Sequence, residues 1–371
     1  MSSATFEIFL GTQPGLEDVL LAEAIEAGFP APVAVGGGVT FEGTWTDVMR
    51  ANVVLRGAAR VLARIGTFRA FHLAQLDKRS RKFPWGDTLR ADVPVRVEVV
   101  TGKRNKIYHA GAAQERIERA ITEELGCPIA EDAPIVIKVR IEDDNVILSV
   151  DTSGEALHKR GFKQGVGKAP MRETMAASLL RACGYAGTEP VLDPMCGSGT
   201  FPIEAAELAK GFYPGRGRSF AFEHLAGFDA AALDALRKEC RPIETDLRFY
   251  GSDRNVNVIG MATDNAARAG VGDICEFKPV PVSAIERPEG PAGLVIVNPP
   301  YGSRVGKKKD LFALYGAFGD VMREKFSGWR VGMVTSDTTL AQATKLPWKP
   351  TGAPIAHGGL KVRLFQTDPL G

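Results

Sequence analysis

The segment with the clearest chemical content is an apolar run that ends in Asn298, Pro299, Pro300 and Tyr301. The two prolines fix the backbone, so the Asn298 side chain and the Pro299 carbonyl are held in place. Both groups can accept hydrogen bonds from a planar NH2 group and would hold its nitrogen in line for attack on an electrophilic carbon. Tyr301 adds a ring on which a base can stack. The segment therefore predicts a site that orients the exocyclic amine of a nucleobase.

A second candidate segment is a glycine-rich turn between an apolar strand and a helix, the place where a parallel sheet binds ligands. It consists of Asp193, Pro194, Met195, Cys196, Gly197, Ser198, Gly199 and Thr200. Thr200 is the expected helix N-cap, and Pro202 suits the first helical turn. Pro202 stands where a dinucleotide loop needs its third glycine, and no phosphate-loop lysine follows. Asp193 instead favours a cationic ligand without phosphate, such as a sulfonium.

An acid at the tip of the next strand usually holds the ribose of a nucleotide-type ligand. Asp253 ends a predicted strand directly before a helix, whereas Glu223 is closer in sequence distance but lacks such a junction. We therefore predict Asp253 as this acid, keep Glu223 as the alternative, and treat residues 211–246 as an insertion. Cys196 has no histidine near it in sequence to act as a base, so we expect it to pack rather than to attack.

The charge is distributed unevenly along the chain. Residues 69–109 contain ten Lys and Arg against four Asp and Glu, although the net charge of the whole chain is only +2. Such a segment indicates contact with a polyanion or else a solvated basic face. The five cysteines form no C-x-x-C pair, so we expect no metal site and a reducing cytoplasm. We also expect no membrane span and no secretion signal.

The two parts of the chain differ in their expected elements. Up to residue 151 we predict strands at 6–10, 39–42, 93–100, 135–141 and 145–151, and helices at 17–27, 46–64 and 114–125. A connector follows, on which His158 and Arg160 are candidates for contact with a ligand or RNA. From residue 172 helices and strands alternate, which favours a parallel α/β sheet. Its strands are expected at 190–193, 248–253, 274–278, 293–297, 330–336 and 360–367, with helices at 200–210, 255–269 and 311–325.

Together these motifs resemble the THUMP-domain RNA guanine-N2 methyltransferases, most closely the bacterial enzymes for large-subunit (23S) rRNA. The resemblance rests on residues 193–200 and 298–302, and on two further segments at 151–162 and 169–174. It covers nearly the whole chain. The glycine loop or the Asn-Pro-Pro-Tyr segment alone would be shared with DNA adenine and protein glutamine methyltransferases.

The resemblance implies an α/β fold in which a Rossmann-like class I methyltransferase domain follows an α+β RNA-binding region. The methyltransferase domain would occupy residues 171–371, with a seven-stranded, mostly parallel sheet that contains one antiparallel strand. A ferredoxin-like region at 1–66, a THUMP domain at 67–152 and a linker at 153–170 would precede it. We expect no second methyltransferase unit of the kind fused in some relatives.

The resemblance also implies transfer of a methyl group from S-adenosylmethionine to the N2 amine of a guanine in RNA, with 23S rRNA favoured over tRNA. The cofactor would be held by residues 193–200 with Asp253 and Arg254, and the amine by residues 298–301. RNA would contact the basic residues Arg79, Arg81, Lys82, Lys103, Arg104, Lys106, Lys307 and Lys308. A cytoplasmic protein is expected, with a monomer favoured.

Two other functions fit part of the pattern. The adenine N6 amine would suit the same segment, and only the resemblance favours guanine. An RNA-binding chaperone with a vestigial methyltransferase fold is the alternative from another class, against which the intact loop, acid and Asn-Pro-Pro-Tyr segment argue. One departure concerns residues 277–283, which contain no carboxylate where many relatives place an acid near the cofactor adenine. Val282 or Ser283 would contribute there through the backbone alone.

Overall fold

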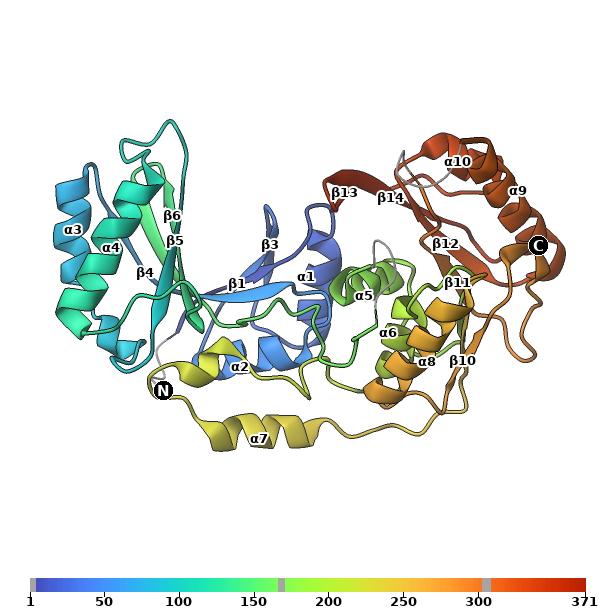
Figure 1. The fold of residues 1–371 in the computed structure, drawn as a ribbon, viewed down its shortest axis with the longest axis horizontal. Coiled ribbons are helices and arrows are strands. Elements are labelled where there is room, and N and C mark those ends of the chain that lie inside the picture. The colour runs from blue at the N-terminus through green and yellow to red at the C-terminus, as the bar shows by residue number, and fades with distance from the viewer. Residues whose placement is uncertain (1–4, 166–170, 302–307) are drawn as a thin grey trace. The chain divides into compact units, whose positions relative to one another are not determined.

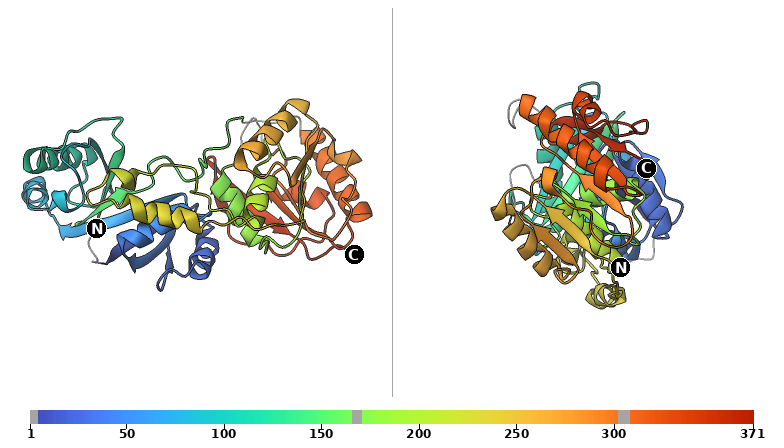
Figure 2. Two further views of the ribbon diagram at one scale, coloured as in Figure 1. Left: turned by 90° about the horizontal axis from the view of Figure 1, so that it is seen from below. Right: turned by 90° about the vertical axis from the view of Figure 1, so that its right-hand side faces the viewer.

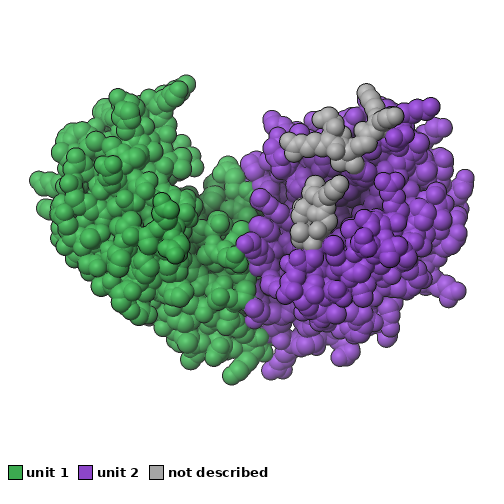
Figure 3. Space-filling model, viewed as in Figure 1, with its two compact units in different colours: residues 1–12, 21–157, 218–239 green, residues 13–20, 158–217, 240–371 purple. Residues whose placement is uncertain are grey.

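The computed structural model describes residues 5–165, 171–301 and 308–371 and divides into two compact units (Figure 3). Unit 1 comprises residues 1–12, 21–157 and 218–239, and unit 2 comprises residues 13–20, 158–217 and 240–371. Helix α1 (Glu17–Glu26) begins in the part assigned to unit 2 and ends in the part assigned to unit 1. No helix among the described residues is both long enough and apolar enough to cross a membrane.

Unit 1 is built on one seven-stranded sheet with the order β2-β3-β1-β4-β7-β6-β5. All its strand pairs are antiparallel except β5 with β6. The strands are β1 (Phe6–Gly11), β2 (Val33–Val35), β3 (Gly38–Gly43), β4 (Arg60–Arg69), β5 (Val95–Thr101), β6 (Ile135–Glu142) and β7 (Asn145–Asp151). The helices are α2 (Trp45–Val54), α3 (Leu73–Arg81), α4 (Ala110–Leu125) and α7 (Ala230–Glu239). Figure 1 shows α3 and α4 side by side next to β4, β5 and β6.

Strand β4 corrects one prediction and bears on another. The helix expected at 46–64 ends at Val54, because residues 60–64 alternate between buried and half-exposed side chains and pair with both neighbouring strands. The domain boundary expected between residues 66 and 67 falls inside this strand. β4 pairs with β1 through Arg60–Ala63 and with β7 over nearly its full length. The ferredoxin-like and THUMP regions that the sequence suggested therefore share one continuous sheet.

The expected insertion at 211–246 contains the segment 218–239, which clusters with unit 1. Backbone bonds tie it there: the Phe222 N–H donates to the Thr152 carbonyl, and the Ala226 N–H donates to the Thr88 carbonyl. The Arg218 guanidinium adds bonds to the carbonyls of Ser153, Glu155 and Ala156. Residues 171–371 are thus not one contiguous unit in the structure, which differs from the expected domain boundary.

Unit 2 is a doubly wound α/β sheet with the order β10-β9-β8-β11-β12-β14-β13. The first five strands are parallel, and β14 pairs antiparallel with both β12 and β13. The strands are β8 (Val191–Asp193), β9 (Phe249–Ser252), β10 (Cys275–Lys278), β11 (Leu294–Val297), β12 (Arg330–Thr335), β13 (Ile355–His357) and β14 (Leu360–Gln366). The helices are α5 (Glu173–Ala182), α6 (Thr200–Ala209), α8 (Val256–Ala269), α9 (Lys308–Lys325) and α10 (Thr338–Ala343).

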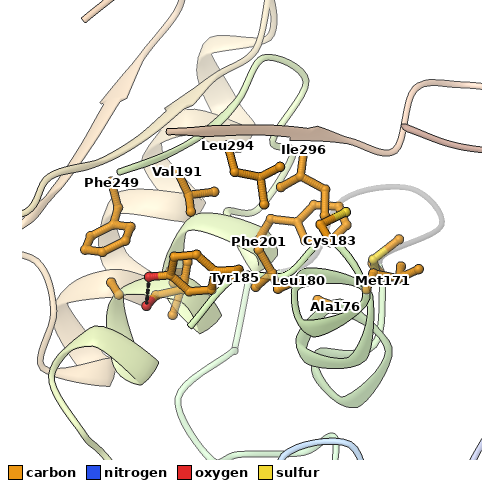
Figure 4. Close-up of a cluster of buried hydrophobic side chains, with 14 of the residues drawn as sticks. Met171, Ala176, Leu180, Cys183, Tyr185, Val191, Phe201, Phe249, Leu294 and Ile296 are labelled. Carbon is orange, nitrogen blue, oxygen red and sulfur yellow. Dashed lines mark hydrogen bonds between the residues drawn. The ribbon is translucent and has the colours of Figure 1, made fainter. Parts of the chain in front are cut away.

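Helices cover both faces of this sheet, which is why the side chains of β11 are buried throughout. Figure 2 shows α5, α6 and α8 on one face and α9 and α10 on the other. On the first face Val191, Leu294 and Ile296 point toward the helices (Figure 4). The alternate residues of the same strands pack against α9 and α10. The sheet is therefore the rigid layer on which the candidate site is built.

One charged pair is fully enclosed in unit 2. The Arg160 Nε of the connector lies 3.1 Å from the Glu204 Oε1 of α6, and their side chains are 2% and 1% exposed. The prediction of Arg160 as a candidate for contact with a ligand or RNA is therefore wrong, because its guanidinium is packed against the helix. Removing one partner would leave an uncompensated buried charge on the other.

We predict that Arg160→Met lowers the free energy of unfolding of unit 2 by about 3–5 kcal/mol. The double variant Arg160→Met/Glu204→Leu should be more stable than the single variant, because no charge is then left buried alone. Asp273→Asn is the control, since it breaks the Lys210 pair at a carboxylate that is 65% exposed and should cost less than about 1 kcal/mol. Urea unfolding followed by Trp329 and Trp348 fluorescence measures all three. A single variant as stable as wild type would contradict the prediction.

Candidate functional site

The three groups that the sequence singled out in the second part of the chain follow three adjacent parallel strands. Asp193 is the last residue of β8, Asp253 follows β9, and Asn298 follows β11. β8 pairs with β9 on one side and with β11 on the other. Because parallel strands end at the same edge, the three side chains gather there although the first and the last are 105 positions apart in the sequence. The predicted juxtaposition of loop, acid and Asn-Pro-Pro-Tyr segment is present.

The glycine turn is bonded to the acid of the neighbouring strand. The Gly197 N–H donates to Asp253 Oδ2 at 3.2 Å, and the Asn255 N–H donates to Asp253 Oδ1 at 2.9 Å. The Cys196 N–H donates to the Ser252 carbonyl at 2.9 Å. Asp253 therefore fixes the turn and the start of α8 together. A carboxylate can accept about four hydrogen bonds, so two of its positions stay available.

Glycine is required in the turn for two reasons. Gly197 has φ +52°, and no described atom lies within 4 Å of the place that a Cβ would take. Gly199 has φ +86°, and a Cβ there would come within 3.0–3.1 Å of Ala262 and the Phe277 ring. Gly199 is also the N-cap of α6, which corrects the prediction of Thr200 by one residue. Open space at Gly197 and tight packing at Gly199 leave room for a ligand on one side of the turn.

Two residues that the sequence analysis did not single out hold this turn by side-chain hydrogen bonds. Asn265 of α8 is fully buried, and its Nδ2 donates to the Ser198 carbonyl at 3.1 Å and to the Gly165 carbonyl at 3.0 Å. Lys163 Nζ donates to Thr200 Oγ1 and to the Met171 carbonyl, both at 2.9 Å, and pairs with Glu173. The part of the connector at 160–165 is thus bound to the turn. A polar residue inside the apolar stripe of the α8 helix was the available signal for Asn265.

The Asn-Pro-Pro-Tyr segment presents an acceptor that has no partner. Asn298 Oδ1 is buried, and among the described residues no donor reaches it. The Pro300 carbonyl is held by the Tyr315 hydroxyl of α9 at 3.3 Å. Tyr301 is half-buried against the core, and burial raises the pKa of its hydroxyl to about 12. A buried acceptor without a donor is costly, so this atom is suited to a donor from a ligand.

Burial also changes the pKa values of an acid and a thiol at this edge. Burial, against the opposing effect of the Met195 N–H bond and with a smaller contribution from the nearby Asp253 carboxylate, raises the pKa of Asp193 to about 8. Burial and both carboxylates raise the pKa of Cys196 well above its usual range, so the thiol stays protonated. Cys196 is therefore a packing residue, as expected. Asp193 is a carboxyl group that a cationic ligand would favour in its ionised form.

The other residues that the sequence predicted as ligand contacts differ in their burial. Pro194 and Ser198 are buried in the turn, Met195 is half-buried and Arg254 is exposed. Glu223, the alternative to Asp253, belongs to unit 1, where it accepts from the Phe220 N–H. In the segment without a carboxylate, Val282 is buried and Ser283 is exposed.

The predicted RNA contacts separate into two kinds. Arg79 and Lys82, together with Lys78, are exposed, have no acidic partner among the described residues, and line a groove beside α3 with a volume of about 760 Å³. Lys103 and Arg104 are likewise exposed and unpaired, and Lys106 lies 3.5 Å from Asp144.

Arg81 differs, because it faces α4 and pairs with Asp77, Glu123 and Glu124 at 2.6–3.0 Å. Its charge is therefore already neutralised. Lys307 and the side chain of Lys308 lie outside the described residues, as do Gly302, Ala169 and Pro170.

Comparisons with known proteins identify the family of the chain. Residues 160–354 match the family described as the RMKL-like methyltransferase domain, and residues 7–62 match the RlmL ferredoxin-like domain. A protein of Aliivibrio salmonicida named ribosomal RNA large subunit methyltransferase K/L is 35% identical over an alignment of 350 residues, which covers 90% of this chain and 50% of the relative. Its counterpart in Psychromonas ingrahamii is 33% identical over 90% of this chain and 46% of its own length. The chain thus spans about half the length of these curated relatives.

Solved structures match over the full length. SMU.472, described as a methyltransferase and solved in complex with SAH, is 27% identical with a TM-score of 0.89, and the match covers 100% of both chains. A Listeria monocytogenes protein described as a predicted N6-adenine-specific DNA methylase is 29% identical with a TM-score of 0.86, covering 98% of this chain and 96% of that one.

The buried Asp193 predicts a pH dependence of stability. Unfolding returns its carboxyl to water, where the pKa is about 3.9. Between that value and the folded value of about 8, the unfolded chain loses the proton that the folded chain keeps. The stability from this group is thus fully present below about pH 4 and falls by at most about 1.4 kcal/mol per pH unit up to pH 8.

Asp193→Asn keeps an acceptor for the Met195 N–H but cannot ionise. Its Tm should therefore exceed that of wild type by a margin that grows from pH 5 to pH 8 and is constant above. Calorimetry of both proteins without added ligand measures this margin. A margin that does not change with pH would rule out the raised pKa.

Proposed function

Because this chain belongs to the family of RMKL-like methyltransferases, we propose that it transfers a methyl group from S-adenosylmethionine to the N2 amine of a guanine in large-subunit ribosomal RNA. The observation that carries the proposal is the buried, unpartnered Asn298 Oδ1 at the same sheet edge as the glycine turn. An NH2 group of a base is the donor that fits it. The names of the curated relatives support rRNA as the substrate.

One set of residues at the edge of the sheet would bind the cofactor, and another set would bind the base. The open side of Gly197 leaves room for the cofactor, Asp253 has free acceptor positions for two ribose hydroxyls, and the buried Asp193 favours a cationic neighbour. When bound, S-adenosylmethionine supplies an electrophilic methyl carbon whose bond to sulfur breaks as the nitrogen–carbon bond forms. Arg254 is exposed and is the weakest member of the proposed set.

Asn298 and the Pro299 carbonyl orient the amine. Each accepts one N–H of the planar NH2 group, which directs the nitrogen lone pair toward the methyl carbon. Tyr301 presents a ring for stacking of the base. The amine gains its acidity only after it has attacked, so the extra proton can leave to water and no strong general base is needed.

The adenine N6 amine is the second candidate target, favoured by the Listeria protein's description as an adenine-specific methylase. tRNA is the alternative RNA. Mass spectrometry of nucleosides from treated rRNA and tRNA separates these cases, because methylguanosine and methyladenosine differ in mass. An RNA chaperone without catalysis would bind no S-adenosylmethionine in calorimetry.

We place the reaction in the cytoplasm, in keeping with five cysteines that are all free thiols.

We predict that Asn298→Ala lowers the rate of methyl transfer by about a hundredfold to a thousandfold, as loss of one preorganised hydrogen-bond partner does elsewhere. Cofactor and RNA affinity should change little, because the side chain acts mainly in aligning the attack. Single-turnover methylation of rRNA with labelled cofactor, beside separate binding measurements, checks both statements.

Two variants serve as controls for this experiment. Asn298→Asp keeps an acceptor at the same position and should retain part of the rate. Tyr301→Phe keeps the ring and should be nearly normal, whereas Tyr301→Ala should also weaken target binding. Near-normal turnover by Asn298→Ala would refute the proposed mechanism and the exocyclic amine as the target.

The α3 groove gives a prediction for RNA affinity. Replacing Lys78, Arg79 and Lys82 by Gln should weaken binding of an rRNA fragment and reduce the slope of log Kd against log salt by about two to three, since fewer counterions are released. Arg81→Gln, on the same helix, should leave this slope unchanged because three carboxylates already neutralise Arg81. Equal slopes for the triple variant and wild type would mean that the groove does not contact phosphates.

A further inference from the structure

Two aromatic side chains at one end of unit 1 are exposed, unlike the other large rings of that unit. Phe71, between β4 and α3, is 40% exposed, and Tyr108, in the loop between β5 and α4, is 57% exposed. Lys106 joins them, since its Nζ lies 4.4 Å from the centre of the Phe71 ring. We call Phe71, Lys103, Arg104, Lys106 and Tyr108 the ring patch.

Phe71 is held rigidly where the chain enters α3. Its N–H donates to Gln75 Oε1 at 2.8 Å, and the Gln75 N–H donates back to His72 Nδ1 at 3.2 Å. The preceding Ala70 N–H donates to the Asp144 carbonyl at 3.0 Å. The ring is therefore presented to solvent on a fixed backbone.

The loop that carries Tyr108 is also fixed. Asn105 Nδ2 donates to Thr101 Oγ1 at 3.0 Å and to the Ile141 carbonyl at 2.6 Å, and Asn105 Oδ1 accepts from the Asp143 N–H. Ile107 is buried beneath the loop. The Tyr108 ring lies 4.3 Å from the His109 ring, which restrains its orientation. Fixed rings lose little conformational entropy when a ligand packs on them.

Positive charges predominate around the rings, although Lys106 also lies 3.5 Å from Asp144. Lys103 and Arg104 are exposed with no acidic partner among the described residues, and the sequence holds no Asp or Glu between residues 99 and 114. Rings that stack on bases beside cations that hold phosphates are the combination that binds single-stranded nucleic acid. In a duplex the bases are already stacked on one another, so the rings would have nothing to stack on.

We infer that the ring patch binds unpaired nucleotides of the RNA substrate, with bases stacked on Phe71 and Tyr108 and phosphates on Lys103, Arg104 and Lys106. This inference rests on the proposed function for RNA as the substrate. It adds that recognition requires a single-stranded segment, which charge alone would not demand. It also names the two rings, Phe71 and Tyr108, on which the single-stranded segment would stack; the basic composition of residues 69–109 did not indicate them.

The test compares two probes on the full chain, a fluorescein-labelled single-stranded 12-mer of uridine and a 12-base-pair RNA duplex. Phe71→Ala and Tyr108→Ala should each weaken binding of the single strand by about fivefold to a hundredfold, with no change in its salt slope. Duplex binding should be nearly unchanged. Replacing Lys103 and Arg104 by Gln should lower the salt slope for both probes.

Two controls isolate stacking. Tyr108→Phe keeps the ring and should bind like wild type, and Val100→Ala removes a non-aromatic side chain that is 69% exposed and should have no effect. Ultraviolet crosslinking of a 4-thiouridine single strand should label the peptides that contain residues 71 and 108. Alanine variants that keep full single-strand affinity, or that lose affinity equally for both probes, would overturn the inference.

Failure of the patch and failure of the proposed function give different results. If the alanine variants bind normally while Asn298→Ala loses methyl transfer to rRNA, the patch is refuted and the proposed function stands. If wild type binds neither probe and methylates no RNA, both are refuted. An acidic peptide as the true partner would show as binding of poly-glutamate by wild type that the RNA single strand does not displace, which also refutes the patch.

Discussion

The candidate site depends on one constraint, the shared direction of five adjacent strands in unit 2. Parallel strands end at one edge, so Asp193, Asp253 and Asn298 meet there although they are far apart in the sequence. Helices on both faces make the strands rigid and dry. The same burial raises the pKa of Asp193 and leaves Asn298 Oδ1 without a donor. The energetic cost of these two groups is what a cation and an NH2 group would relieve.

The edge of the sheet alone does not fix the glycine turn, which is also held by side chains from other segments. Asn265 and Lys163 bind the turn and the connector by side-chain bonds that cross from one segment to another. Arg160 and Glu204 close the same region with a buried charge pair. Such a pair adds little net stability but disfavours any arrangement that separates its partners. The connector is therefore part of the framework of the turn rather than a loose link.

The sequence predicted unit 2 better than unit 1, for physical reasons. Strands such as β11 are continuous apolar runs between glycine or proline breaks, so they were located to within a residue or two. The first half of strand β4, residues 60–64, was predicted as helix because its alternating pattern follows closely on the true helix α2. Helix α3 was missed because it is mostly polar and buries only Leu76 and Ser80.

For the site, residue type and order located the three groups at the edge, since chemistry and strand ends are both visible in sequence. The pairing of Arg81 with Glu123 and Glu124 and the partners of Asn265 were not visible, because they depend on contacts with segments about 40 to 100 residues away. Long-range pairing decides whether a charge is free or neutralised, and no local pattern records it.

The placement of residues 218–239 in unit 1 has a consequence for how the chain folds during synthesis. The first 157 residues leave the ribosome without the segment that supplies donors to Thr88 and Thr152 and carries α7. Another 82 residues must be made first, which takes about 4 to 16 seconds at bacterial translation rates. Unit 1 therefore stays incomplete while the first strand and helix of unit 2 have already left the ribosome. Unit 1 begins first during synthesis, but it is completed only after part of unit 2 has been made.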